Sequence, residues 1–265
     1  MPGMTKAPDI PCTLLAGGVA MPMVGFGTWQ LRGSAGYEAI LVALQAGYRH
    51  IDTATMYGNE AEVGHALRDS GLDRRQVFLT TKLPPGKAGR ERQTLCASLR
   101  ALGTDYVDLW LVHWPPAARA LVPMWNEFLS LRGAGMARAV GVSNFSIAQI
   151  DRLISSTGAA PVVNQIPWSP ARFDAARLAA SRERQVVTEG YSPLKGTHLA
   201  DPVLTGIAAR HGVTPAQVVL RWHIEHGIPV IPKSAHPGRI KENIDLLGFS
   251  LSPDEVASID SLPGR

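Results

Sequence analysis

Short apolar runs alternate with amphipathic segments along almost the whole chain. Eight of these runs read as strands, and several are continuously apolar rather than alternating with polar residues. Continuous apolar runs of this length are typical of strands that are buried on both faces of a parallel sheet. The runs are MVGFGTW near residue 25, HIDTA from His50, VFLTTKL from Val77, YVDLWLVH from Tyr106, ARAVGVSN from Ala137, VVNQI from Val162, VVTEGYS from Val186 and IPVIPK from Ile228.

The intervening segments carry the signals of helix starts. Four residue pairs have the spacing of a capping box, in which two side chains satisfy free backbone N–H groups at a helix start. In two of them a proline also occupies the first helical position, where its missing N–H costs nothing. The pairs are Asn59–Glu62, Ser146–Gln149, Thr214–Gln217 and Ser252–Glu255.

This rhythm predicts a single α/β domain over residues 1–265. Eight strands that alternate with about eight helices in about 250 residues are typical of a (β/α)₈ or TIM barrel. The opening segment TLLAGGVAMPMV has a Gly-Gly turn between short apolar runs, so we expect an N-terminal β-hairpin that covers one end of the barrel. A doubly wound sheet is the alternative, because eight such units do not by themselves specify closure.

Composition and charge narrow the class of protein. Hydrophobic residues make up 45% and charged residues 18%, which favours a large core. The absence of an apolar stretch of about 18 residues argues against a membrane helix. The N-terminal MPGMTKAPDIP lacks the hydrophobic region of a secretory signal, so a cytoplasmic location is expected. Two cysteines, Cys12 and Cys96, are too few for a disulfide framework or a multi-cysteine zinc site. The net charge of +4 is dispersed, which argues against nucleic-acid binding but leaves room for one anionic ligand.

Polar residues gather where the predicted strands end. Active sites of such barrels lie at the C-terminal ends of the strands, so these side chains would point into one mouth. Taken singly, each has a structural explanation, such as a helix cap or a solvated strand end, but their joint placement favours a shared function. They are Asp52, Lys82, His113, Ser143, Asn144, Gln165, Tyr191, Ser192, Lys233 and Ser234, with Tyr57 shortly after the second strand.

Four of these residues make chemical sense as a set. A buried Lys82 that Asp52 holds in its charged form would lower the pKa of the Tyr57 phenol and make it a usable proton donor. The imidazole of His113 could orient and polarise a carbonyl oxygen. A metal-dependent hydrolase that uses His50, Asp52 and His113 is an alternative, but further ligands at the other strand ends are missing, so no metal is predicted.

Several longer motifs together resemble those of the aldo-keto reductase superfamily. In chain order they are HIDTATMYGNEAEVG, FLTTKL, DLWLVHWP, AVGVSNF, NQ at 164–165, YSPL and IPKSAHPGRIKENI. The similarity runs from GFGTW to the C-terminal helix and is closest to short bacterial members similar to 2,5-diketo-gluconate reductases. The resemblance implies a monomer that reduces aldehydes or ketones to alcohols with NADPH. A non-catalytic NADPH-binding regulatory protein of the same fold is the alternative.

The resemblance also implies roles for individual residues. Asp52, Tyr57, Lys82 and His113 match the catalytic tetrad, with Tyr57 as general acid. The implied cofactor site comprises Ser143, Asn144 and Gln165 on the nicotinamide carboxamide, Tyr191 stacked on the ring, Lys233, Ser234 and Arg239 on the 2′-phosphate, Glu242 and Asn243 at the adenine, and also Gly27, Thr28, Asp52, Ser192 and Leu194. The implied substrate pocket comprises Phe26, Trp29, Tyr57, His113 and Trp114. Independently of the family, a cationic cluster with a hydroxyl at a strand end and helix start is an anion site. Together with the resemblance, this site implies NADPH rather than NADH.

Two departures from the family pattern concern the rim of the mouth. Residues 166–170 read Ile-Pro-Trp-Ser-Pro where members often have Val-Glu-Tyr-His-Pro. The chain stops at SLPGR, and the segment between Leu194 and Asp201 is short. We therefore expect a differently shaped loop after Gln165 and a more open active site.

Overall fold

A parallel barrel forms the centre of the computed structural model, which describes residues 10–263. Seven strands form one sheet in chain order, and each pairs in parallel with the next. The strands are β3 Phe26–Gly27, β4 His50–Asp52, β5 Phe78–Leu83, β6 Val107–Val112, β7 Ala137–Ser143, β8 Val163–Pro167 and β9 Val187–Tyr191. The predicted (β/α)₈ barrel is confirmed. The predicted absence of a secretory signal falls on residues 1–9, which lie outside the described residues.

The eighth predicted strand, IPVIPK, is wrong as a regular strand. Only Val230 pairs with both edges of the sheet, through parallel bridges to Val24 and to Gly190. Pro229 and Pro232 flank this residue, and a proline has no N–H to donate to a ladder. The barrel is therefore closed by backbone hydrogen bonds of the irregular segment 229–232 instead of a regular strand.

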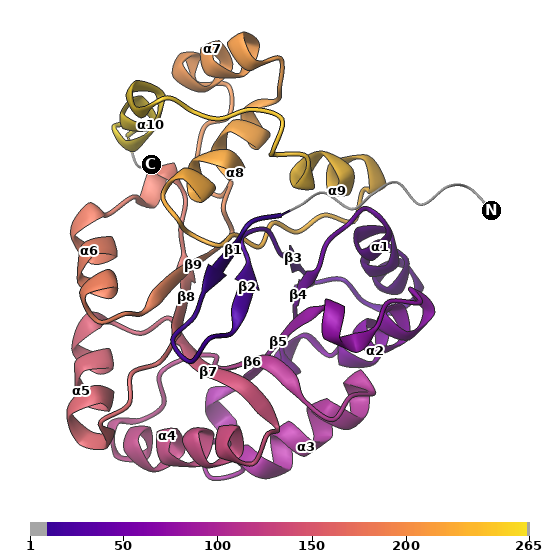
Figure 1. Ribbon diagram of the computed structural model, residues 1–265, viewed down its shortest axis with the longest axis vertical. Coiled ribbons are helices and arrows are strands. Elements are labelled where there is room, and N and C mark those ends of the chain that lie inside the picture. Colours follow the sequence, from indigo (N-terminus) through magenta and orange to yellow (C-terminus); the bar gives the residue numbers. More distant parts are fainter. Residues whose placement is uncertain (1–9, 264–265) are drawn as a thin grey trace.

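Helices surround the sheet (Figure 1). Helices α1 to α6 ring the strands, whereas α7 to α10 gather at one side of the barrel. No helix within residues 10–263 is long and apolar enough to span a lipid bilayer. The helices are α1 Gly33–Gln45, α2 Glu60–Asp69, α3 Glu91–Leu102, α4 Ala118–Gly133, α5 Ile147–Thr157, α6 Ala175–Glu183, α7 Pro202–His211, α8 Pro215–Glu225, α9 Pro237–Ile244 and α10 Pro253–Asp260, with short 3₁₀ turns at Thr55–Tyr57, Arg74–Gln76, Pro85–Lys87 and Pro170–Arg172.

Three of the four predicted capping boxes are confirmed, those at Ser146, Thr214 and Ser252. The fourth is wrong. The buried Asn59 side chain makes no cap at α2 but donates to the carbonyl oxygens of Thr28 and Leu31, each at 2.8 Å. Thr28 and Leu31 are both buried, so their carbonyl oxygens depend on donors within the protein. Asn59 therefore ties the loop after β3 to the loop after β4, both at the mouth of the barrel.

The predicted N-terminal hairpin is confirmed and covers one end of the barrel (Figure 1). Strands β1 Cys12–Leu14 and β2 Ala20–Pro22 pair in antiparallel fashion. The turn contains Gly17 and Gly18 with φ of 93° and 83°, a region that side chains other than glycine rarely adopt. Behind the turn, buried apolar side chains of the hairpin pack against the barrel interior. The hairpin closes the N-terminal end, and the strand C-termini form the open mouth.

Two helical glycines give a matched test of the packing between α2 and α3. A Cβ atom on Gly64 would lie 2.7 Å from the carbonyl oxygens of both Ala101 and Leu102, whereas one on Gly206 in α7 would approach only Arg210, at 3.8 Å. We expect Gly64→Ala to destabilise the protein by about 1–3 kcal/mol, because backbone must shift. Gly206→Ala should stabilise it by about 0.5–1 kcal/mol, because the unfolded chain loses freedom. Denaturant unfolding measures both, and changes of equal sign and size would contradict the close helix contact.

Candidate active site

A cavity of about 550 Å³ opens at the C-terminal ends of the strands. Most of the side chains that the sequence singled out meet there, although they come from segments far apart in the chain. The predicted site residues that line it are Gly27, Trp29, Asp52, Tyr57, His113, Trp114, Ser143, Asn144, Gln165, Tyr191, Ser192, Leu194 and Lys233.

An ion pair lies at the bottom of this cavity. The Lys82 ammonium, on β5, donates to Asp52 Oδ1 at the end of β4 (2.6 Å) and to the Thr53 carbonyl oxygen (2.9 Å). Both side chains are almost completely buried, at 0% and 2% exposure. Burial by itself lowers the pKa of Lys82, but the Asp52 carboxylate beside it raises the pKa above its ordinary value. Lys82 is therefore charged at neutral pH, as the sequence predicted.

The Tyr57 side chain lies directly over this pair. Its ring centroid is 5.2 Å from Lys82 Nζ, and the Tyr57 carbonyl oxygen accepts a hydrogen bond from Arg32 Nε at 2.9 Å. The prediction that the pKa of this phenol is lowered is wrong in its net direction. Burial raises the pKa of Tyr57, and the charge of Lys82 lowers it by less, so the result lies above the ordinary value. The phenol is consequently protonated throughout the neutral range and can act as a proton donor.

The His113 imidazole stands beside the phenol. The two ring centroids are 5.7 Å apart at an interplanar angle of 77°. Burial, with a smaller contribution from the charge of Lys82, lowers the pKa of His113 to about 3, so the ring is neutral. Its Nδ1 is buried and has no hydrogen-bond partner among residues 10–263. An unpaired lone pair at Nδ1 costs less than an unpaired N–H, which favours the tautomer with its hydrogen on Nε2.

Hydrogen bonds link the ends of β7, β8 and β9. The Ser143 hydroxyl donates to the Gln165 carbonyl oxygen at 2.8 Å, and the Tyr191 hydroxyl donates to Asn144 Oδ1 at 2.8 Å. The Gln165 side-chain Nε2 donates to Asp52 Oδ2 at 2.8 Å. The polar groups around the mouth are thereby connected to the buried ion pair.

Backbone strain is concentrated at the same place. The structure has four non-glycine residues with positive φ in the part of the chain that it describes. Three of them, Gln30, Asn144 and Ser192, line the mouth cavity, with φ of 66°, 64° and 53°. Such conformations persist where the surroundings enforce them, and they cluster at functional sites.

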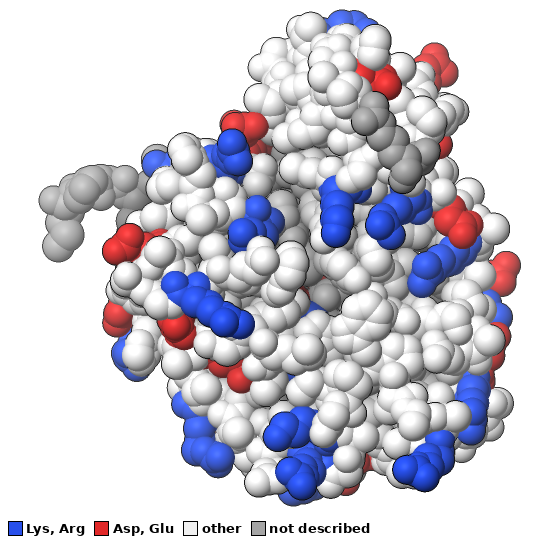
Figure 2. All heavy atoms as spheres, turned by 180° about the vertical axis from the view of Figure 1, so that it is seen from behind, with Lys and Arg blue, Asp and Glu red and all other residues white. Residues whose placement is uncertain are grey.

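The predicted phosphate-binding residues lie at the edge of the mouth. Lys233 lines the cavity, and Arg239 is exposed on α9. Neither forms a salt bridge with any group in residues 10–263, so both cations can take a ligand. Ser234 is buried, and its Oγ accepts from the His236 N–H at 3.0 Å. Figure 2 shows this face of the molecule, where Lys and Arg side chains border a central hollow.

The remaining predicted residues do not reach the cavity. Thr28 is buried behind it and donates through Oγ1 to the Asp52 carbonyl oxygen at 2.9 Å. Phe26 belongs to the apolar core, where its ring meets Tyr48 at 5.4 Å. Glu242 accepts from Thr214 Oγ1 at 2.7 Å, and Asn243 is buried in α9.

Sequence reasoning missed several residues of the mouth. Met56, Gln30 and Lys195 line the cavity, and Met56 is 55% exposed. Each of them is adjacent in the chain to a predicted site residue, Tyr57, Trp29 or Leu194, and this proximity could have indicated that they line the cavity. It also missed Glu189, whose carboxylate accepts from Gln165 Nε2 at 2.9 Å. A charged residue within the apolar run VVTEGYS could have drawn attention to it.

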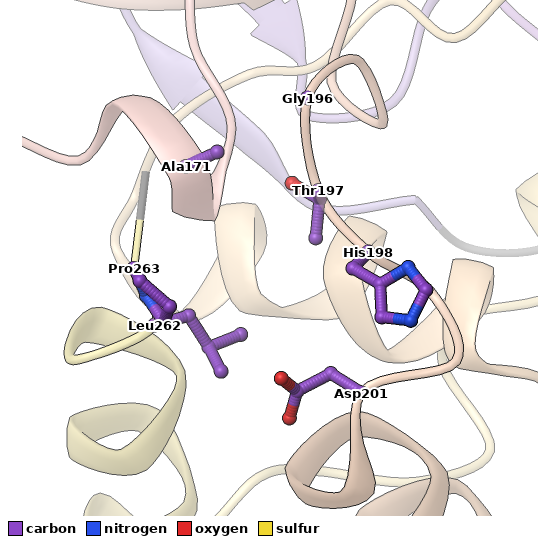
Figure 3. A pocket seen from close by; sticks show the side chains of 7 residues that line it. All are labelled: Ala171, Gly196, Thr197, His198, Asp201, Leu262 and Pro263. Atoms are coloured by element: carbon purple, nitrogen blue, oxygen red, sulfur yellow. The ribbon is translucent and has the colours of Figure 1, made fainter. Parts of the chain in front are cut away.

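The C-terminal segment packs away from the mouth. Figure 3 shows Leu262 and Pro263 on one side of a small separate cavity, with Thr197, His198 and Asp201 on the other. No described residue beyond Lys233 lines the mouth cavity. The last two residues, 264–265, lie outside the described part, and the expectation of a more open site remains a prediction.

The alternative metal site finds no geometric support. Within residues 10–263, no group of three His, Cys, Asp or Glu side chains is arranged so that it could hold a metal ion. His50 lies inside the barrel, where Nδ1 is 3.4 Å from the Pro22 carbonyl oxygen and Nε2 is 3.3 Å from Thr80 Oγ1.

Comparison with known proteins identifies the family of this chain. Residues 23–263 match the Aldo/keto reductase family, and the chain belongs to that family. Membership makes it an oxidoreductase that acts on small carbonyl compounds.

Individual relatives confirm the predicted resemblance to bacterial 2,5-diketo-gluconate reductases. It is 41% identical to 2,5-diketo-D-gluconic acid reductase B from a Corynebacterium species, over 96% of this chain and 94% of that protein. An aldo/keto reductase structure from Brucella melitensis has a TM-score of 0.92 at 43% identity, covering 95% and 99% of the two chains. A Bombyx mori aldo-keto reductase, solved in complex with NADP, has a TM-score of 0.89 at 34% identity, covering 96% and 93%.

Proposed function

We propose that this protein is an NADPH-dependent reductase that converts aldehydes and ketones to alcohols, with Tyr57 as the general acid. One observation carries the proposal. The protonated Tyr57 phenol and the neutral His113 imidazole meet at 5.7 Å over a completely buried Lys82–Asp52 pair, at the bottom of an open cavity. A structural role for Tyr57 would not require a buried charge beneath its ring.

Each residue of the proposed tetrad has a separate role in the transfer of the proton. NADPH, when bound, supplies the hydride to the carbonyl carbon. Tyr57 donates its proton to the carbonyl oxygen as negative charge develops there. Lys82, held charged by Asp52, stabilises the phenolate that remains on Tyr57. His113 donates from Nε2 to the same oxygen and fixes its direction.

The polar groups of the mouth fit a dinucleotide phosphate. Unpaired cations, Lys233 and Arg239, suit the 2′-phosphate, together with the Ser234 hydroxyl. Amide and hydroxyl groups at the strand ends suit the carboxamide, and the flat ring of Tyr191 suits the nicotinamide. The NADP complex of the Bombyx mori relative supports a nicotinamide cofactor. We assign to the rest of the cofactor site the residues Gly27, Thr28, Asp52, Ser143, Asn144, Gln165, Ser192, Leu194, Glu242 and Asn243.

The rim of the cavity favours small or flat carbonyl compounds. Trp29, Met56 and Trp114 are 56%, 55% and 46% exposed and present apolar surface next to Tyr57 and His113. An apolar rim around a few convergent polar groups is typical of sites for small molecules. Phe26 would support this pocket from the core without touching the substrate.

The direct test is oxidation of NADPH in the presence of a panel of aldehydes, ketones, keto-sugars and dicarbonyls, with NADH run in parallel. We expect turnover with NADPH and slower turnover with NADH. Tight NADPH binding without turnover on any member of the panel would favour the non-catalytic binding protein instead.

Removal of the two unpaired cations should change cofactor choice. Charge-assisted hydrogen bonds contribute about 1.5–3 kcal/mol each, so Lys233→Ala and Arg239→Ala should each raise the Michaelis constant for NADPH about 10-fold to 100-fold. The constant for NADH should barely change, because NADH has no 2′-phosphate. Lys241→Ala, on the same helix α9 but two residues further along, is the matched control. Equal losses with both cofactors would contradict a 2′-phosphate site.

We further propose that residues 1–265 act as one domain, as a monomer in the cytoplasm, with small molecules rather than nucleic acid or membrane as partners. Size-exclusion chromatography with light scattering tests the monomer, and a mass of twice 28.4 kDa would contradict it.

A further inference from the structure

A carboxyl group that the proposed reaction does not use lies beneath the mouth. Glu189, on β9, is completely buried inside the barrel. Its Oε2 accepts a hydrogen bond from Gln165 Nε2 at 2.9 Å. Its Oε1 has no hydrogen-bond partner among residues 10–263, and the nearest ring nitrogen, His50 Nε2, is 3.7 Å away. Burying such a group is costly, so its retention at this position calls for a reason.

The contacts of Gln165 show what Glu189 holds in place. The two hydrogens of its side-chain amide point to Asp52 Oδ2 at 2.8 Å and to Glu189 Oε2 at 2.9 Å. A rotated amide would bring its carbonyl oxygen against two acceptor oxygens, which is unfavourable. Gln165 Oε1 is thereby kept on the other side of the amide, and no group in residues 10–263 donates to it. Because Gln165 lines the mouth cavity, a ligand can supply that donor.

The groups around Glu189 indicate that it carries a proton. On β4, Asp52 shares the Gln165 amide with it, but Asp52 is paired with Lys82 of β5, whereas Glu189 has no cation of its own. His50, also on β4, faces the Pro22 carbonyl oxygen through Nδ1, so Nδ1 carries the hydrogen and Nε2 is an acceptor.

Glu189 Oε1 thus faces an acceptor, which favours a hydrogen on Oε1. Burial, followed by the charge of Asp52, raises the pKa of Glu189 to about 8, in agreement with this arrangement.

We propose that Glu189 is a positioning residue that locks the Gln165 amide with Oε1 toward the mouth, so that the site selects a cofactor carboxamide that can donate an N–H. This inference rests on the proposed NADPH-dependent function and deepens it. It predicts discrimination at the nicotinamide end of the cofactor and none at the adenosine end.

The test compares ligands that differ at one group. The probes are NADP⁺, its 3-acetylpyridine analogue, in which a methyl group replaces the carboxamide NH₂, and 2′,5′-ADP, which lacks the nicotinamide. Dissociation constants are measured by calorimetry or tryptophan fluorescence. Since one hydrogen bond distinguishes the two dinucleotides, wild-type protein should bind NADP⁺ on the order of 10-fold more tightly than the analogue.

Three variants separate positioning from general stability. Glu189→Met should lose most of the 10-fold preference and keep its affinity for 2′,5′-ADP. Glu189→Gln should keep the preference, because its side-chain oxygen can still accept from Gln165 while its NH₂ group faces the acceptor His50 Nε2. Thr188→Val is the matched control, since Thr188 is also buried on the same strand but lines a separate hollow beside the hairpin. It should behave as wild type.

The outcomes distinguish the inference from the function on which it rests. A folded Glu189→Met protein with an unchanged preference would overturn the positioning role and leave the reductase proposal intact. A wild-type protein that binds neither dinucleotide would overturn the proposed function, and the inference with it.

A second measurement requires no substitution at position 189. In protein labelled with ¹⁵N-glutamine, both side-chain amide hydrogens of Gln165 should resist exchange with solvent, before and after NADP⁺ is added. Gln165→Met assigns the signal by its disappearance. Rapid exchange of either hydrogen would contradict the locked amide.

Discussion

Replacing Tyr57 by phenylalanine should lower the rate of NADPH-dependent carbonyl reduction by about 100-fold to 10,000-fold. The variant loses only the hydroxyl that donates the proton, while its ring keeps the edge contact with His113 at 5.7 Å. The dissociation constant for NADPH, measured by fluorescence in the absence of substrate, should change by less than about 3-fold.

Tyr191→Phe is the matched control for this experiment. Tyr191 also lines the cavity, and its hydroxyl donates to Asn144 Oδ1 at 2.8 Å, away from the proposed proton transfer. We expect a small effect on turnover. Activity close to wild type in Tyr57→Phe would remove Tyr57 from the role of general acid.

The second large effect concerns the buried ion pair. Lys82→Met removes the cation that lies 2.6 Å from Asp52 Oδ1 and leaves an uncompensated carboxylate at 2% exposure. Breaking a buried pair in this way costs about 3–5 kcal/mol of stability. Activity should also fall by at least about 100-fold, because nothing stabilises the phenolate of Tyr57.

A double variant separates these two consequences. Asp52→Asn combined with Lys82→Met removes both charges, so most of the lost stability should return in denaturant unfolding, whereas activity should not. Recovery of activity in the double variant would show that Lys82 contributes only through folding. A double variant as unstable as Lys82→Met would contradict the uncompensated charge as the cause.

The barrel itself was predictable because its signals are local. Continuous apolar runs, three correct capping boxes and the Gly17–Gly18 turn each depend on a few neighbouring residues. The eighth run is not a regular strand because Pro229 and Pro232 have no N–H to donate, so its ladder is reduced to the bridges of Val230 and a few further backbone hydrogen bonds. Both prolines are visible in the run IPVIPK. Their missing N–H groups argue against a regular strand more strongly than the apolar pattern argues for one.

The residues that line the cavity could largely be predicted from the sequence, but the pKa of Tyr57 and the hydrogen-bond partners of Asn59 could not. Strand ends converge at one mouth, which brings Asp52, Tyr57 and His113 together whatever the details of packing. The sequence could not weigh the burial of Tyr57 against the charge of Lys82, and burial wins. Asn59 shows the same limit, because its three-residue spacing to Glu62 suggests a cap while the tertiary structure gives its amide other acceptors.

Glu189 was missed for a related reason. Its neighbours Gln165 and His50 lie 24 and well over 100 residues away in the chain, and only closure of the barrel brings them together. A single charged residue in an apolar strand indicates a buried polar group, but the sequence does not show which side chains surround that group.

The central claim is transfer of a hydride from NADPH to a carbonyl carbon within this mouth. It is tested most directly with NADPH deuterated at C4 of the nicotinamide, one deuterated epimer at a time, together with a carbonyl substrate from the panel. Mass spectrometry of the alcohol should show one deuterium on the carbinol carbon with one epimer and none with the other. Alcohol that forms without deuterium from either epimer, or no alcohol with any carbonyl compound, would contradict the account.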